Sequence, residues 1–197
     1  MRYLAMALLA LSACGTASEE AHLHKVVIVQ RTTEAVPGPR YELQLEIDDI
    51  TGGQVLTRLS QPDGPDVVPL RSMTVGDTAP FEFDGRGQRL GLSTMTNRLI
   101  GDDWAEFHVG DPVAVRDAQI AAILETIQTS RATFLVRGEP CDGATMAKHL
   151  RRAYAKVTDP VEDGRAFIER VVADGSYGVR ALPDQTTPLP RWIRGRR

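Results

Sequence analysis

Two side chains in the last third of the chain, Cys141 and His149, are of the types that form a nucleophile and its base. Pro140-Cys141-Asp142 precedes a predicted helix, and a helix N-terminus lowers the pKa of a thiol. On one helix, the eight residues between Cys141 and His149 correspond to about 12 Å of rise. A nucleophile and its base need contact at about 3 Å. We therefore expect Cys141 to be structural and His149 to be a packing residue with one hydrogen bond.

Two further histidines, His22 and His24, form an H-x-H pair near the start of the chain. Imidazole nitrogens bind copper, nickel and zinc, but a complete site needs three or four ligands. The pair is therefore only a weak metal candidate, which titration with copper or nickel would test. The sequence indicates no other cofactor.

The first fourteen residues have the order of an export signal: Arg2 supplies a charge, Tyr3 to Leu11 is apolar, and Leu11-Ser12-Ala13-Cys14 closes the run. As a helix, Tyr3 to Ala13 is about 16 Å long, roughly half the thickness of a bilayer core. We therefore do not expect a membrane span.

The same stretch resembles the bacterial lipoprotein signal, in which the box cysteine is lipidated and becomes the mature N-terminus. The resemblance implies removal of residues 1–13 and acyl chains such as palmitate on Cys14. Gly15 stands where the inner-membrane retention signal has Asp, which implies an outer-membrane anchor facing the periplasm. The alternative is a cleaved signal that releases a soluble exported protein.

Composition and charge indicate two folded modules after a short tether. The sequence is 42% hydrophobic and 25% charged, as in ordinary globular proteins. Residues 15–115 hold 8 Lys and Arg against 16 Asp and Glu, whereas residues 116–197 hold 14 against 10. If Cys14 carries lipid, Cys141 has no partner for a disulfide within the chain, so stability must come from the core.

The predicted tether covers residues 14–25 and the first module covers residues 26–115. Tyr41, Leu43, Leu45 and Ile47 alternate with polar residues, which is the period of a half-buried strand. Further strand candidates, separated by Gly, Asp and Pro turns, recur every 8 to 15 residues. The pattern predicts an antiparallel β-sandwich or barrel.

The second module, residues 116–197, changes to the helical period. Ile120, Ile123, Leu124 and Ile127 predict an amphipathic helix that Asp117 would cap. A strand and turn at 133–138, a helix after Asp142, a third helix at about 161–173 and a strand at 177–182 follow. The chain would end in a Pro-rich turn and a basic tail. The fold class is therefore α+β, with a small helix-hairpin-helix-helix module after the sheets.

A series of single residues between about 118 and 193 resembles the DUF5329 family of exported bacterial proteins, which has no assigned function. The marks are Ile123-Leu124, Ile127, Ser130, Phe134, Arg137-Gly138, His149-Leu150-Arg151, Phe167-Ile168 and Trp192. Cys141 stands where the family has an aromatic residue. The resemblance implies a helix, a short hairpin, an H-L-R helix and a further Phe-Ile helix, but no catalytic role.

Two functions remain open from the sequence. The preferred one is a lipid-anchored, non-enzymatic binding or accessory protein of the cell envelope. The alternative is an envelope hydrolase with His149, Arg137 and Asp142 in a groove between the modules. Nucleic acid is excluded as a partner of an exported protein, whereas anionic lipid or an envelope protein fits a cluster of cations, unless that cluster is simply solvated. The cluster comprises Arg151, Arg152, Lys156, Arg194, Arg196 and Arg197.

Overall fold

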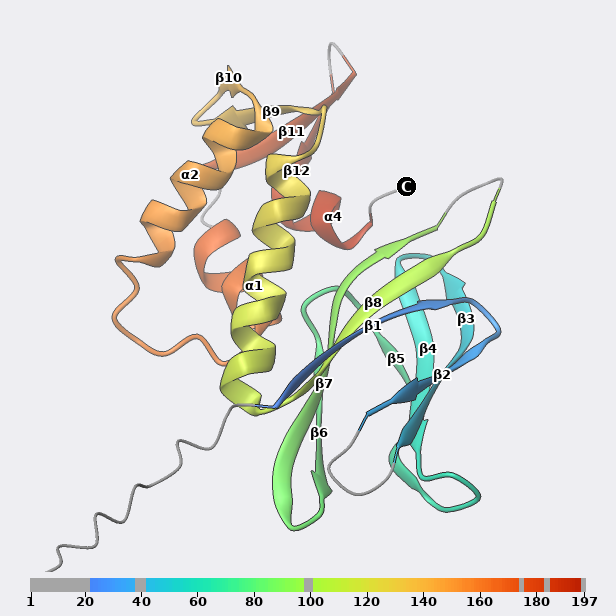
Figure 1. The fold of residues 1–197 in the computed structure, drawn as a ribbon. Coiled ribbons are helices and arrows are strands. Elements are labelled where there is room, and N and C mark those ends of the chain that lie inside the picture. The colour runs from blue at the N-terminus through green and yellow to red at the C-terminus, as the bar shows by residue number, and fades with distance from the viewer. Residues whose placement is uncertain (1–21, 38–41, 98–100, 174–175, 183–184, 196–197) are drawn as a thin grey trace, which may run out of the picture.

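The computed structural model describes residues 22–37, 42–97, 101–173, 176–182 and 185–195 (Figure 1). The lipidation candidate Cys14 and the basic residues Arg196 and Arg197 lie outside these ranges. Within them, no helix is both long enough and apolar enough to cross a bilayer. The described chain is an α+β protein with antiparallel sheets.

The first half of the described chain forms two four-stranded antiparallel sheets. One sheet has the order β1-β8-β7-β6 and the other has the order β2-β3-β4-β5. The strands are β1 (Leu23–Val29), β2 (Thr33–Val36), β3 (Leu43–Thr51), β4 (Gln54–Ser60), β5 (Asp66–Met73), β6 (Thr78–Phe83), β7 (Arg86–Thr96) and β8 (Trp104–Gly110). Strand β1 begins at Leu23, three residues before the predicted Val26, so the segment predicted as tether overlaps this strand.

Strand β3 confirms the alternation predicted from the sequence. Leu43, Leu45 and Ile47 are buried, and a register shift between Ile47 and Asp49 changes the phase, so that Ile50 is buried as well. Gly52 and Gly53 then form the turn into β4, with φ values of 57° and 83° that favour glycine.

The described part of the second half contains four α-helices, one π-helical turn and a third antiparallel sheet of order β10-β9-β11-β12. Its elements are α1 (Pro112–Gln128), β9 (Thr133–Val136), β10 (Glu139–Cys141), α2 (Gly143–Tyr154), α3 (Gly164–Phe167), the π-turn η1 (Ile168–Val172), β11 (Tyr177–Leu182), β12 (Gln185–Pro188) and α4 (Leu189–Arg194). The predicted third helix is therefore two short helical segments. The predicted Pro-rich turn and basic tail are in fact β12 and α4.

Helix α1 begins earlier than its apolar period indicates. Asp111 is the N-cap, and its carboxylate accepts hydrogen bonds from the backbone N–H groups of Val113 and Ala114 at 2.9 and 3.2 Å. The prediction that Asp117 caps this helix was wrong. The helix already begins at Pro112, and proline is well suited to the first helical position, where its missing N–H would have no partner. Asp117 lies one turn inside the helix and is exposed.

One buried glutamine joins the two halves. The side-chain amide of Gln119 on α1 donates to the carbonyl oxygens of Asp77 and Leu92, both at 3.0 Å, and accepts from the Gly164 N–H at 3.2 Å. Gly164 also lies against Gly76, where a Cβ atom on either glycine would come within 3.0 Å of the other segment. The buried apolar residues of both halves accordingly form one continuous core.

Candidate functional site

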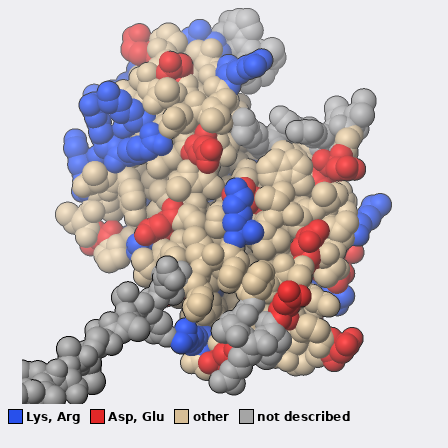
Figure 2. Space-filling model, viewed as in Figure 1, with Lys and Arg blue, Asp and Glu red and all other residues tan. Residues whose placement is uncertain are grey.

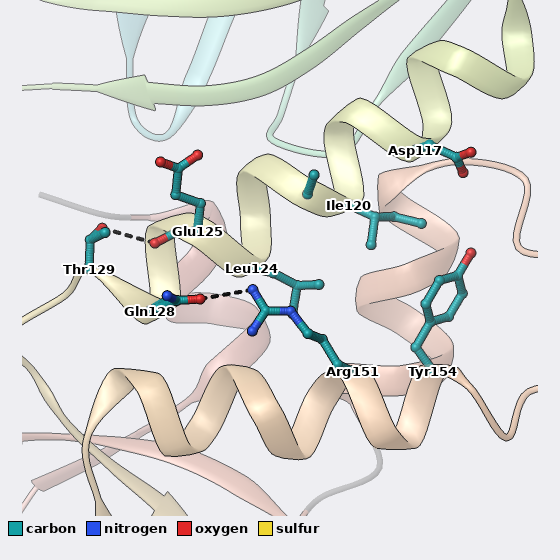
Figure 3. Close-up of a pocket in the computed structure, with 9 residues that line it drawn as sticks. Asp117, Ile120, Leu124, Glu125, Gln128, Thr129, Arg151 and Tyr154 are labelled. Carbon is teal, nitrogen blue, oxygen red and sulfur yellow. Dashed lines mark hydrogen bonds between the residues drawn. The ribbon is translucent and has the colours of Figure 1, made fainter.

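A groove of about 580 Å³ lies between α1 and α2 (Figure 3). We call it the α1–α2 groove. Ile120, Ala121 and Leu124 give it an apolar floor. Its remaining lining residues are Asp117, Glu125, Gln128, Thr129, Arg151 and Tyr154. An apolar floor beside a few polar groups is typical of a binding site.

A glycine determines how the two helices meet. Gly143, the first residue of α2, packs so closely that a Cβ atom there would lie 2.1 Å from the carbonyl oxygen of Ile127 on α1. The helices are therefore in backbone contact at this end. Figures 1 and 3 show their axes separating from there toward the N-terminal end of α1. The groove opens where they separate.

Two side chains of α2 form one side of the groove. Arg151 donates from Nη2 to Oε1 of Gln128 on α1 at 2.8 Å, which holds the guanidinium across the groove. Tyr154 packs its ring edge-to-face on Phe167, with ring centroids 5.4 Å apart. Both groups are thus held in place with their polar ends at the groove, where they can donate hydrogen bonds to a ligand.

Of the charged groups that line the groove, Arg151 is the one that an anionic ligand can pair with. Asp117 forms an ion pair with Arg116 at 2.8 Å. Figure 3 shows the Glu125 side chain pointing away from α2. A ligand that brings an anionic group to the α2 side therefore meets Arg151 with little opposing charge.

The outer face of α2 is strongly basic. Lys148, Arg151 and Arg152 on α2 are exposed, as is Lys156 just beyond its end, and Figure 2 shows Lys and Arg side chains gathered over this helix. Arg194, which the sequence placed in the same cluster, lies on α4 and contacts Glu169 at 3.3 Å. The part of the predicted basic cluster that the structure describes therefore divides into an exposed group at α2, in which Arg151 bonds to Gln128, and an arginine on α4 that pairs with Glu169.

The three catalytic candidates come from different parts of the second half. Arg137 lies exposed in the β9–β10 turn with a positive φ of 54°. Asp142 is the N-cap of α2, and hydrogen bonds from the Thr145 backbone and side chain lower the pKa of its carboxyl group. His149 is half-buried on α2, seven residues or about 10 Å of helical rise beyond Asp142. The shallow pocket that Asp142 lines includes neither Arg137 nor His149.

Cys141 is the last residue of β10 and is half-buried. Burial, and secondly the charge of Asp142, raise the pKa of its thiol. The lowered pKa expected from a helix N-terminus is therefore wrong: the helix begins at Gly143, and the carboxylate of Asp142 caps it by accepting from the Thr145 N–H. A thiol with a raised pKa is a poor nucleophile at neutral pH, which agrees with a structural role.

A histidine–serine pair that the sequence did not indicate lies inside the first half. His108 Nδ1 and the Ser93 hydroxyl are 2.6 Å apart, across neighbouring strands β8 and β7. Ser93 is fully buried and His108 is 7% exposed. Desolvation lowers the pKa of His108, although Glu106 opposes this effect. The pair resembles a catalytic dyad in distance, but burial closes the hydroxyl to a substrate, so the pair is a cross-strand contact inside the protein.

His22 and His24 lie at the start of the first sheet, His24 within β1. Both line a narrow cavity of about 30 Å³ together with Phe81 and Phe83. Across the described ranges, no group of three or more His, Cys, Asp or Glu side chains could hold a metal ion. The histidine pair therefore has no third ligand of these types among the described residues.

Comparisons of the chain with protein-family models, with curated proteins and with solved structures find no match. The resemblances to the lipoprotein signal and to the DUF5329 family stay predictions from the sequence. The α1–α2 groove is the candidate functional site, because it combines an apolar floor, positioned polar groups and an available cation.

Proposed function

We propose that this protein is a lipid-anchored, non-enzymatic binding protein of the cell envelope. The anchor is a lipid on Cys14, and the compartment is the periplasmic face of the outer membrane. The Leu11-Ser12-Ala13-Cys14 box and Gly15 support this proposal. At the finer level of the fold, we infer that the two N-terminal sheets form a sandwich or barrel and that a DUF5329-like helix-hairpin-helix-helix unit follows.

The α1–α2 groove is the observation that carries the binding role. Arg151 is held across the groove by Gln128, and Ile120 and Leu124 lie beneath it. A segment of a partner protein that presents an apolar side chain next to a carboxylate would contact both features at once. Burying the apolar group and pairing the carboxylate with Arg151 would each favour the complex.

Membrane attachment is tested by mass spectrometry and fractionation of the full chain and of a Cys14→Ser variant. We expect the parent to begin at Cys14 with added acyl mass and to remain in the membrane fraction. The variant should leave that fraction in salt washes that retain the parent. An intact Met1 on the parent chain, or equal retention of the two proteins, would contradict the anchor.

The groove is tested by recovering partners from membranes with the anchored protein. Ala121 lines the groove and is exposed, so Ala121→Trp fills the groove without disturbing the core. Ala144→Trp is the matched control, because Ala144 is an exposed residue of α2 that does not line the groove. Partners lost with Ala121→Trp and kept with Ala144→Trp support the groove. Equal recovery with both variants contradicts it.

A further inference from the structure

Strand β1 presents an apolar outer face to solvent. Its inward side chains Val26 and Ile28 are buried, whereas Val27 is 52% exposed and Leu23 and Val29 are also exposed. Val113, at the start of α1, is 54% exposed. We call Leu23, Val27, Val29 and Val113 the β1 strip. Exposed apolar residues that lie together on one face are typical of an interaction surface.

The register of the sheet places this strip on the same side as the helices. Lys25 of β1 pairs with His108 of β8, which pairs with Gly91 of β7, so the three residues point to one face. A Cβ atom on Gly91 would lie 2.7 Å from Cγ1 of Val115, which shows that α1 packs on that face. Val27 and Val29 follow Lys25 at spacings of two residues, so their side chains point to the same face as that of Lys25. The strip therefore lies beside α1.

The same side of the molecule carries the basic face of α2. In the view of Figures 1 and 2, β1 runs across the front and the cations gather over α2. From residue 143 to residue 158 the sequence contains four Lys and Arg residues and no Asp or Glu. Two carboxylates near the strip are already paired, Glu106 with Lys25 at 2.6 Å and Asp117 with Arg116. The face therefore combines an apolar strip on β1 with a cluster of cations at α2.

We propose that the β1 strip and the cations of α2 together seat the protein on an anionic lipid surface. The proposal deepens the proposed function and rests on it, because an anchor on Cys14 keeps the face near the bilayer. Leu23 follows Cys14 by nine residues, which span at most about 30 Å when extended. The apolar side chains enter the boundary between headgroups and acyl chains, and Lys148, Arg152 and Lys156 contact the headgroup phosphates.

Vesicle binding of the full chain carrying Cys14→Ser tests this face without the lipid. Partition is measured by sedimentation with vesicles of phosphatidylcholine, alone or with phosphatidylglycerol. Residues 1–21 are the same in every variant, so differences between variants report on the face. We expect tighter binding to the anionic vesicles, and an Arg152→Glu, Lys156→Glu double variant should lose that preference by at least about tenfold, since each surface cation contributes about fivefold. Val27→Asp should weaken binding to both kinds of vesicle.

Matched controls come from the second sheet. Leu70 is 53% exposed on β5, and its neighbour Arg71 is also exposed. Leu70→Asp and Arg71→Glu should bind like the parent. The proposal is overturned if these controls lose as much binding as the variants of the face, or if no variant changes the partition. It is also overturned if light scattering shows that Val27→Asp abolishes a dimer, because the strip would then join two copies.

Failure of the anchor and failure of the face are distinguishable. An intact Met1 on the parent chain contradicts lipidation but leaves the vesicle preference of the Cys14→Ser chain unchanged. Conversely, suppose that the parent is lipidated but the Cys14→Ser chain shows no preference for anionic vesicles. This result would support the proposed function and contradict the inference about the β1 strip.

Discussion

At the scale of single residues, Gln119 is the polar group on which the junction between the two halves depends. Replacement by Leu keeps much of the volume but leaves the buried Gly164 N–H without its acceptor. A buried unsatisfied group costs about 1–3 kcal/mol, so Gln119→Leu should lower the free energy of unfolding by about that amount. Urea denaturation followed by circular dichroism measures the change.

Gln128→Leu is the control for this prediction. Gln128 is exposed on the same helix and bonds only to the exposed side chain of Arg151 among the described residues. Its replacement should change the free energy of unfolding by less than about 0.5 kcal/mol. Equal losses of unfolding free energy in the two variants would show that the buried hydrogen bonds of Gln119 add nothing to stability beyond the helix propensity of the residue.

His108 should make stability depend on pH between about 5.5 and 7.5. Burial lowers the pKa of folded His108 below its ordinary value of 6.5. As the pH falls through 6.5, the unfolded chain takes up a proton that the folded chain does not bind until a lower pH. The free energy of unfolding therefore decreases toward acid and is unaffected by this group above the unfolded pKa.

Denaturation at pH 7.5 and 5.5 checks this sign. In a His108→Gln variant, the free energy of unfolding should differ less between pH 7.5 and pH 5.5 than it does in the parent. The Gln128→Leu variant, which changes no titratable group, should keep the difference of the parent. A parent that is more stable at pH 5.5 would contradict the assignment.

At the scale of elements, the contact between α1 and α2 depends on the missing side chain of Gly143. Gly143→Ala places a methyl group where the carbonyl oxygen of Ile127 now lies, so the helices must separate. Overpacking of this kind costs about 1–3 kcal/mol. Thermal unfolding should show a lower Tm, and recovery of groove partners should fall.

Gly87→Ala is the matched control for the helix contact. A Cβ atom at Gly87 would meet nothing within 4 Å, and the residue is exposed in β7. Its replacement should leave both the Tm and partner recovery close to those of the parent. A Gly143→Ala protein that melts like the Gly87→Ala protein would show that the helices can adjust at no cost.

At the scale of the whole molecule, the continuous core predicts that the two halves unfold together. The chain has two tryptophans, Trp104 in β8 and Trp192 in α4, one in each half. Trp192 packs edge-to-face on Phe134 at 5.2 Å, so its fluorescence reports on the second half. Trp104→Phe and Trp192→Phe each leave one reporter. Each variant should give one fluorescence transition whose midpoint coincides with the midpoint measured by circular dichroism on the same variant. A fluorescence change that precedes the loss of secondary structure would indicate separate domains.

The apolar period alone was enough to predict several elements. It correctly predicted the alternation of β3 and the buried face of α1, including Ile123 and Ile127, because burial of one side of a strand or helix follows directly from local geometry. It misplaced the start of α1, since Asp111 caps the helix outside the apolar stripe and Asp117 only resembles a cap. Local pattern also failed at β12 and α4, whose positions depend on β11 and on the core.

The order of residues alone tells which chemical groups this protein carries: an apolar start that ends in Cys14, an acidic first half and a basic stretch at residues 148–156. How those residues combine depends on the three-dimensional fold. The fold places Arg151 against Gln128, and it puts Arg137 in a turn, Asp142 at the N-cap of α2 and His149 seven residues further along that helix. It also left one face of β1 uncovered beside α1. The reason is that a groove or a face is made by residues distant in sequence, whose approach depends on close contacts such as Gly143 with Ile127 and Gly91 with Val115.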